Sequence, residues 1–375
     1  MDSAAAPAPE PAMPRRLLPV LGLLVLAPVC AEYLIGYDQI IGRPLELLSG
    51  LLVLAPLYGT VAVLIRETAR RTGRGWPTIL LLGAAFGLVE AGLVDQSLFN
   101  PDFVAEPSWD QERMPTFLPV PGVSVKQLLG FVAGHVIWSF AAPIAVVEAC
   151  VPRLAGRPWL GRAGTAVVVV LYVLAVVVFT HEHTRTFLAS PVQLGVTAVA
   201  VLALAAAASL LPRRLVSGRV TSRRAVSPWV AGGAAVVLLA VHQLAPSTWT
   251  GTAVDIAALA LGGVLLLWCS RGAGWGGHHV LAVAGAALVV NAALSFAVDP
   301  LGEVSLPVKY AVNTALTVGV LVLLAGAHLR VRRAGSRGGP GAGAAPRSGV
   351  RAGAVSTTSD IRNSGIRDGR TGQPS

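Results

Sequence analysis

The stretch LELLSGLLVLAPLYGTVAVLI, residues Leu45–Ile65, is followed directly by RETARRTGR, residues 66–74. An α-helix of about 20 apolar residues crosses a hydrocarbon core about 30 Å thick. The arginines close the run, because a charged side chain is costly inside a bilayer. This stretch therefore predicts a membrane-spanning helix that ends in a basic segment.

The same pattern recurs along the chain. Apolar residues make up 54% of the 375 positions and charged residues 13%, whereas about a quarter of the residues in a soluble domain are charged. Ten runs approach the spanning length: Leu17–Ile35, Leu45–Ile65, Pro77–Phe99, Gln127–Val151, Ala163–Thr180, Ser190–Leu211, Pro228–Leu244, Thr252–Cys269, His279–Val298 and Leu306–Leu329. We predict an all-α fold, a polytopic transmembrane helix bundle of about ten spans, in which Pro228–Leu244 and Thr252–Cys269 are the shortest.

Basic residues are distributed unequally between the two sets of loops. With a cytoplasmic N-terminus, the inner loops hold eighteen and the outer loops five. The inner set is Arg15, Arg16, Arg66, Arg70, Arg71, Arg74, Arg153, Arg157, Arg162, Arg213, Arg214, Arg219, Arg223, Arg224, Arg271, Arg330, Arg332 and Arg333. The outer set is Arg43, Arg113, Lys126, Arg185 and Lys309. Cytoplasmic loops carry the excess of basic residues, so we predict an N-in and C-in orientation.

The formal net charge of +10 does not indicate nucleic-acid binding, because such a surface needs its basic residues clustered on one folded face. Dispersed juxtamembrane arginines attract anionic lipids instead. We expect the lipid bilayer as partner and no nucleic acid, while membrane-protein partners and the oligomeric state stay open. The abundance of Ala, Gly, Val and Arg is typical of a GC-rich genome, so we expect a multi-pass protein of a bacterial plasma membrane.

The ends of the chain differ in composition from its middle. An Ala/Pro-rich leader and a Gly/Ser/Arg-rich tail have too few large apolar residues to form a core. We predict a disordered leader at 1–14, a transmembrane helical domain at 15–333 and a disordered cytoplasmic tail at 334–375. The outer loop 100–126 has five prolines, which exclude a regular helix through it, and its Trp109 and Phe117 favour a lid on the outer interface over a loose loop.

Ionisable side chains inside spans are costly and often mark a site. By helix rise, Glu90 and His135 lie near the bilayer middle on consecutive, antiparallel spans. They are the candidate catalytic or metal-binding residues, and a buried polar tie between two helices is the alternative. A substrate-binding or structural polar cluster is predicted around them in the outer half of spans one to five: Glu32, Glu46, Asp95, Gln96 and Ser139. Glu148 and Asp255 lie near span ends, where each can reach the interface.

Residues 66–140 resemble the CAAX-processing and PrsW-like intramembrane proteases. The resemblance rests on Arg66–Arg71, on Phe86–Glu90 and on the Phe-xxx-His motif of Phe131–His135. It implies that Glu and His activate water for peptide hydrolysis through a metal, with zinc as the cofactor. The paired Glu-Glu of that family is missing, and Glu67 lies in a predicted cytoplasmic loop, away from the other two motifs in depth.

Three classes of function remain open, and the sequence does not settle whether the protein is an enzyme. A non-catalytic role in scaffolding, assembly or sensing is favoured, because most polar features have a structural explanation. A small-molecule transporter with 5+5 inverted repeats is the first alternative. An intramembrane metalloprotease-like enzyme is the second. No phosphate-binding loop, dinucleotide fingerprint or nucleophile elbow occurs in the sequence.

Overall fold

The computed structural model describes residues 13–104, 106–211 and 221–337. Residues 1–12 of the predicted leader and residues 338–375 of the predicted tail lie outside the described residues. Nine described helices are long and apolar enough to cross a membrane, and Pro228–Leu244 is a tenth, shorter apolar helix. The prediction of a polytopic helical membrane bundle is confirmed.

The first four spans are each built from more than one helical segment. Their elements are α1 Met13–Pro28 and η1 Val29–Tyr33; α2 Pro44–Leu54, η3 Ala55–Gly59 and α3 Thr60–Arg71; α4 Trp76–Val89 and η4 Glu90–Val94; and α6 Val125–Gly134, η6 His135–Ala141 and α7 Ala142–Cys150. The segments η1, η3, η4 and η6 are π-helical. Such π-helical turns inside α-helices are rare and frequently occur at functional sites.

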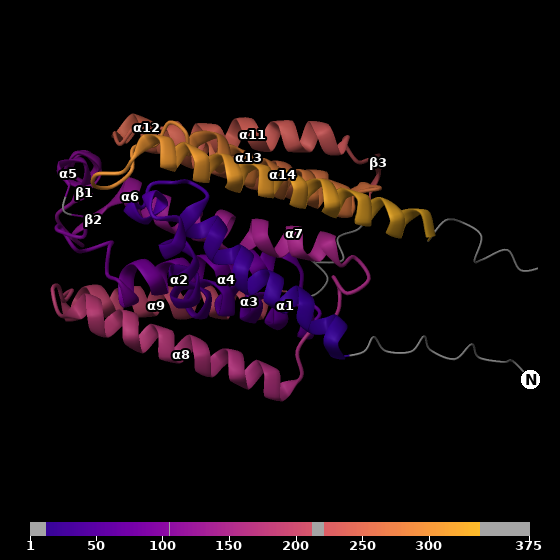
Figure 1. The fold of residues 1–375 in the computed structure, drawn as a ribbon, viewed down its shortest axis with the longest axis horizontal. Coiled ribbons are helices and arrows are strands. Elements are labelled where there is room, and N and C mark those ends of the chain that lie inside the picture. The colour runs from indigo at the N-terminus through magenta and orange to yellow at the C-terminus, as the bar shows by residue number, and fades with distance from the viewer. Residues whose placement is uncertain (1–12, 105, 212–220, 338–375) are drawn as a thin grey trace, which may run out of the picture. The chain divides into compact units, whose positions relative to one another are not determined.

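The remaining described spans are α-helices without a π-helical turn. They are α8 Arg162–Thr184, α9 Pro191–Leu210, α11 Pro228–Leu244, α12 Trp249–Cys269, α13 Gly277–Leu294 and α14 Leu306–Arg337. The spans run side by side, and α1 begins at the same end of the bundle at which α14 ends (Figure 1). We call this the basic end, because the arginine-rich connections lie there, and we call the other the opposite end.

Several helix boundaries differ from the prediction, and three of them concern the charged ends of spans. The second span continues through Arg71, and α14 continues to Arg337. Helix α1 begins at Met13, so the last two residues of the predicted leader are already helical. In the second span the helix extends past Ile65 because its charged side chains find ion-pair partners inside the protein, as described below.

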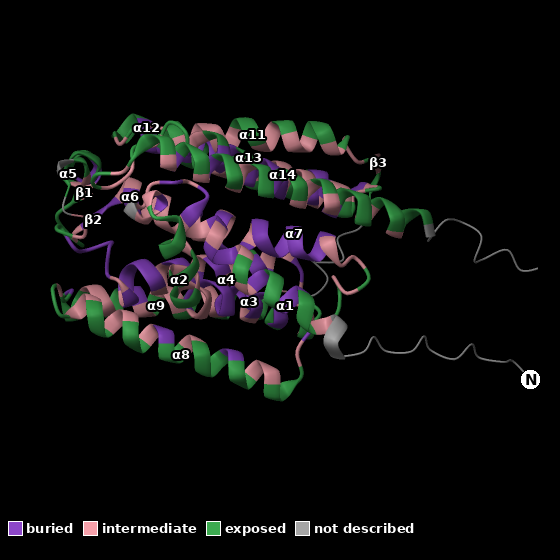
Figure 2. Ribbon diagram, in the orientation of Figure 1, coloured by how far each residue is buried: buried purple, intermediate pink, exposed green. Residues whose placement is uncertain are grey.

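Burial is concentrated in a few helices. Purple, buried residues gather on α3, α4, α7 and α13, whereas most of α8, α9 and α12 is exposed or half-buried (Figure 2). The two largest apolar clusters of the core lie around Phe140 and around Leu288. The exposed faces of α8 and α9 carry valine and leucine, which is the surface expected of helices that contact lipid.

Close approach of the first two spans depends on a glycine. A Cβ atom at Gly59 would lie 2.5 Å from the backbone oxygen of Leu24 and 2.7 Å from its Cα. Only glycine allows two helix backbones to approach so closely. The result is that η3 packs on α1, which brings the polar side chains of the two spans together.

The loop at the opposite end is folded. It contains α5 Pro107–Arg113, the 3-10 turn η5 Met114–Thr116, and an antiparallel pair of short strands, β1 Phe117–Leu118 and β2 Val123–Ser124. The Trp109 ring packs against Phe103 and Phe131. As expected from its prolines, the only α-helix in this loop is the seven-residue α5 among the described residues. The function of the loop as a lid stays a prediction.

Three other short elements connect the spans. The 3-10 turn η2, Gln39–Gly42, precedes α2, and Asp38 caps it by accepting a hydrogen bond from the Ile40 N–H. At the basic end, β3 Thr221–Arg224 pairs in parallel with β4 Gly272–Ala273. This pairing joins the segment before α11 to the turn between α12 and α13.

Candidate functional site

The π-helical segments of the first four spans carry the polar residues of the candidate site. Glu32 lies on η1, Tyr58 on η3, Glu90 on η4, and His135 and Ser139 on η6. A π-helical turn shifts the side chains that follow it around the helix axis relative to a continuous α-helix. The sequence indicated four of these residues but not Tyr58, and it did not reveal that all five lie on π-helical segments.

Glu32 is held by a tyrosine. The Tyr37 hydroxyl donates a hydrogen bond to Glu32 Oε2 at 2.6 Å. The negative charge of Glu32, followed by burial, raises the pKa of the Tyr37 hydroxyl well above its usual range. Tyr37 therefore stays protonated and remains a donor, which favours the ionised form of Glu32.

Asp95 and Gln96 follow η4 at the opposite end. Asp95 Oδ1 accepts a hydrogen bond from the Ser97 N–H at 2.9 Å. Gln96 is buried with a φ of 58°, and its Oε1 accepts a hydrogen bond from the Ala189 N–H at 2.7 Å. Gln96 thus has a structural role, because it ties η4 to the connection between α8 and α9.

Glu90 differs from these residues because no hydrogen bond to its carboxyl group is found within the described residues. Its side chain is 2% exposed, and Oε2 is buried without a hydrogen-bond partner. Its carboxyl group interacts electrostatically with those of Asp95 and Glu32. Among the described residues, no basic side chain forms an ion pair with any of these three carboxyl groups.

His135 faces α4, the helix that leads into Glu90, but it forms no hydrogen bond with Glu90 in the described chain. Its ring packs 5.8 Å from that of Tyr58 and 5.9 Å from that of Phe86, and its Nδ1 lies 3.1 Å from Ser139 Oγ. A Cβ atom at Gly87 would lie 3.2 Å from His135 Cβ. Within the described chain, no hydrogen bond or ion pair joins Glu90 to His135, so the predicted polar tie does not form in this structure.

Glu46 takes no part in the cluster. It lies on α2, which has no buried residue, and it pairs only with Arg43, at 3.2 Å. Both side chains are more than half exposed. The sequence placed Glu46 in the site by depth alone, and depth does not reveal which way a side chain points.

The arrangement of side chains that could ligate a metal does not support a metal centre. In the ranges that the structure describes, no group of three or more His, Cys, Asp or Glu side chains is placed to hold a metal ion. A protein zinc site generally supplies three or four ligands. Glu90 and His135 therefore do not fit the zinc site that the protease resemblance implies, and we derive no chemistry through a metal.

A second buried charge cluster was missed by sequence reasoning. Asp255 is fully buried, with Oδ2 2.6 Å from Lys126 Nζ and Oδ1 2.5 Å from His242 Nδ1. The ring of Trp138 on η6 stacks on His242 at 5.7 Å. The expectation that Asp255 reaches the interface is wrong, because Lys126, expected in an outer loop, forms an ion pair with it inside the protein. Pairing across 129 positions leaves no local signal in the sequence.

A third cluster, which we call the arginine network, lies at the basic end. Arg66 is fully buried and binds Glu148 Oε1 at 3.0 Å and Glu67 Oε1 at 2.9 Å. Arg70 donates to both oxygens of Glu148, at 2.8 and 2.6 Å. The Arg66 guanidinium lies 3.5 Å from the centre of the Trp159 ring. Arg66 and Glu67 are therefore not loop residues as predicted, and Glu148 does not reach the interface.

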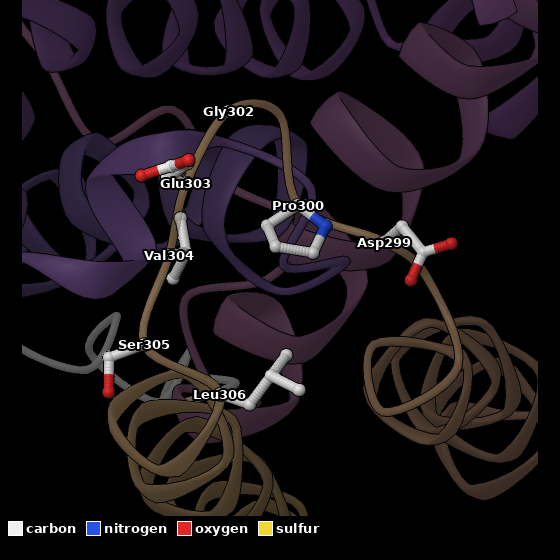
Figure 3. Close-up of a pocket in the computed structure, with 7 residues that line it drawn as sticks. All are labelled: Asp299, Pro300, Gly302, Glu303, Val304, Ser305 and Leu306. Carbon is white, nitrogen blue, oxygen red and sulfur yellow. The ribbon is translucent and has the colours of Figure 1, made fainter.

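The connection between α13 and α14 encloses a hollow at the opposite end. It is lined by Asp299, Pro300 and the residues of 302–306. Figure 3 shows that the Asp299 and Glu303 side chains lie on different sides of it and do not converge. None of the predicted site residues lines this hollow, and we assign it no role.

The fold and the buried polar groups define the class: a polytopic helical membrane protein with charged side chains inside the bundle. Residues 21–334 match a family described as an uncharacterized membrane protein family, and the chain belongs to that family. This match gives no support to the resemblance to CAAX-processing and PrsW-like proteases. No curated protein and no solved structure matches the chain.

Proposed function

We propose that the protein is a non-catalytic membrane protein that binds a proton at Glu90 and responds to it. The observation that carries the proposal is the unpartnered, buried Glu90 carboxyl group, which lies beside two other acidic groups. A role in sensing is the one that we favour. Transport coupled to the same proton is the alternative.

The cost of burying charge supports proton binding. An ionised carboxylate without partners is expensive in a low-dielectric interior, and such a group neutralises by taking up a proton. Glu32 and Asp95 each accept hydrogen bonds that stabilise the anion. Because no hydrogen bond to Glu90 is found in the described part of the chain and two acidic groups lie near it, Glu90 is the member of the cluster that a proton neutralises most favourably.

The tight packing of the cluster favours a small ligand. Tyr58, Phe86 and Glu90 are all buried, and their surroundings are filled by neighbouring rings. A proton needs no cavity, whereas an organic cation needs one. A monovalent metal ion is the competing small cation, and the experiment below separates the two.

The alternatives have less geometric support. If the protein were an intramembrane protease of the kind it resembles, Glu67 would belong to the site. In this structure Glu67 Oε1 accepts hydrogen bonds from Arg66 and the Trp159 N–H, and Oε2 accepts them from Arg71 and the Leu160 N–H. In the inverted-repeat reading the two halves resemble each other, but the π-helical turns of the described spans all lie in the first four. Intramembrane carboxyl groups are nevertheless common in proton-coupled carriers, so transport remains the alternative role.

Carbodiimide modification tests proton binding, because dicyclohexylcarbodiimide reacts with protonated carboxyl groups in apolar surroundings. We expect the purified protein to be modified at Glu90, with less modification as the pH rises. Peptide mass spectrometry locates the adduct. The exposed Glu46 is the matched internal control and should stay unmodified.

The carbodiimide experiment distinguishes a proton from a sodium ion at Glu90. Protection of Glu90 by sodium at constant pH would assign the site to a metal ion. An unmodified Glu90 across the pH range would refute proton binding. Where the adduct forms, the Glu90→Gln variant should lose it, which confirms the assignment of the modified peptide.

A further inference from the structure

We infer that the basic end carries a binding site for the headgroups of anionic phospholipids, formed by Arg223, Arg224 and Arg271 together with Trp268 and Trp229. We call these five residues the arginine–tryptophan patch. The inference is independent of the proton site, which lies in the first four spans.

The short strands β3 and β4 assemble the patch. The Thr221 N–H donates to the Arg271 carbonyl at 2.9 Å, and the Ala225 N–H donates to the Ala273 carbonyl at 2.9 Å. Arg223 and Arg224 lie between these two bonds, on β3. Arginines that are about fifty residues apart in the sequence are thereby held on one small surface.

The patch joins positive charge to exposed aromatic rings. The Arg223 guanidinium lies 3.3 Å from the centre of the Trp268 ring and donates to the Trp268 carbonyl. Trp268 is 52% exposed and Trp229 is 86% exposed. Tryptophan at this level of a span anchors in the headgroup region, and an arginine stacked on it presents its remaining N–H groups to phosphate.

The patch has no internal counter-charge. Between Glu182 and Asp299 the only acidic residue is Asp255, which is buried and paired with Lys126 and His242. Within the described ranges, Arg224 and Arg271 are exposed and their side chains make no ion pair or hydrogen bond. The negative charge that balances these arginines must therefore come from outside this part of the chain. Because Trp268 and Trp229 are expected at the level of the lipid headgroups, that charge is expected at the same depth.

Anionic phospholipids match the unbalanced arginines and the exposed tryptophan rings better than a protein partner or a free anion does. A headgroup phosphate supplies the charge, and the acyl chains contact the apolar faces of α11 and α12. Basic residues near an anionic bilayer surface contribute about 1 kcal/mol each, which corresponds to about a five-fold effect on binding per arginine.

Native mass spectrometry tests the site. The protein is reconstituted in nanodiscs of equal parts phosphatidylglycerol and phosphatidylcholine, released, and scored for retained lipids. We expect wild-type protein to retain phosphatidylglycerol preferentially. The Arg224→Gln/Arg271→Gln variant should bind it more than ten-fold less well. Because both side chains are exposed and form no hydrogen bond or ion pair within the described ranges, the variant should fold normally.

The matched control removes as many positive charges elsewhere at the basic end. Arg153→Gln/Arg157→Gln alters two exposed arginines of the connection between α7 and α8, and it should keep the preference. Equal loss in both variants, or no loss in the first, overturns the local site. A Trp268→Leu variant that loses thermal stability without losing phosphatidylglycerol would also contradict it, because the ring would then serve folding alone.

Discussion

Replacing Glu148 by glutamine is expected to destabilise the protein by about 3–5 kcal/mol. Glu148 accepts hydrogen bonds from Arg66 and Arg70, and Arg66 is fully buried. Without the carboxylate, Arg70 loses both of its charged contacts. Arg66 keeps the carboxylate of Glu67 and the backbone carbonyls of Leu154 and Ala155. Breaking a buried ion pair is costly because it leaves the remaining charge buried without compensation.

Reversible unfolding in mixed detergent micelles measures the effect of Glu148→Gln. The control is Glu46→Gln, which removes an exposed ion pair with Arg43, and exposed pairs contribute only 0 to about 1 kcal/mol. If the two variants lose similar stability, the arginine network does not hold the basic end together.

The second large effect is expected at Asp255. In Asp255→Ala, Lys126 and His242 lose the carboxylate that each contacts, and we expect the free energy of unfolding to fall by about 3–5 kcal/mol. Adding Lys126→Met should restore part of this loss, because the variant no longer buries an unpaired ammonium group. The interaction energy from the double-mutant cycle isolates the pair.

Two outcomes would contradict the structure at Asp255. The first is additive loss in the double variant, which would mean that Lys126 and Asp255 do not interact. The second is a loss no greater than that of Glu182→Gln, which removes an exposed ion pair with Arg185. Either result would place Lys126 in the outer loop as a free charge, as the sequence alone predicted.

The fold was predictable because its signals are local. Apolar length gave the spans to within a few residues, and even the short segment Pro228–Leu244 forms the predicted helix. The boundaries that were wrong, such as the end of the second span, depend on ion pairs between distant segments. Arg66 and Glu148 are 82 positions apart, and composition cannot reveal that they meet.

The site was predictable only in part. Depth along the spans follows from helix rise, and it predicts one region for Glu32, Glu90 and Asp95, whose carboxyl groups interact electrostatically in the structure. Rotation about the helix axis does not follow from one sequence when π-helical turns intervene. Glu46 was therefore included although its side chain is exposed, and a polar tie between Glu90 and His135 was kept as an alternative although His135 packs on rings.

The central claim is that Glu90 carries a proton in the folded protein. Infrared spectroscopy tests it most directly, since the carbonyl stretch of a protonated carboxylic acid is separate from the carboxylate bands. The account predicts such a band at neutral pH in wild-type protein and in Glu46→Gln, and its loss in Glu90→Gln. A spectrum in which Glu90→Gln removes only carboxylate intensity would contradict the account.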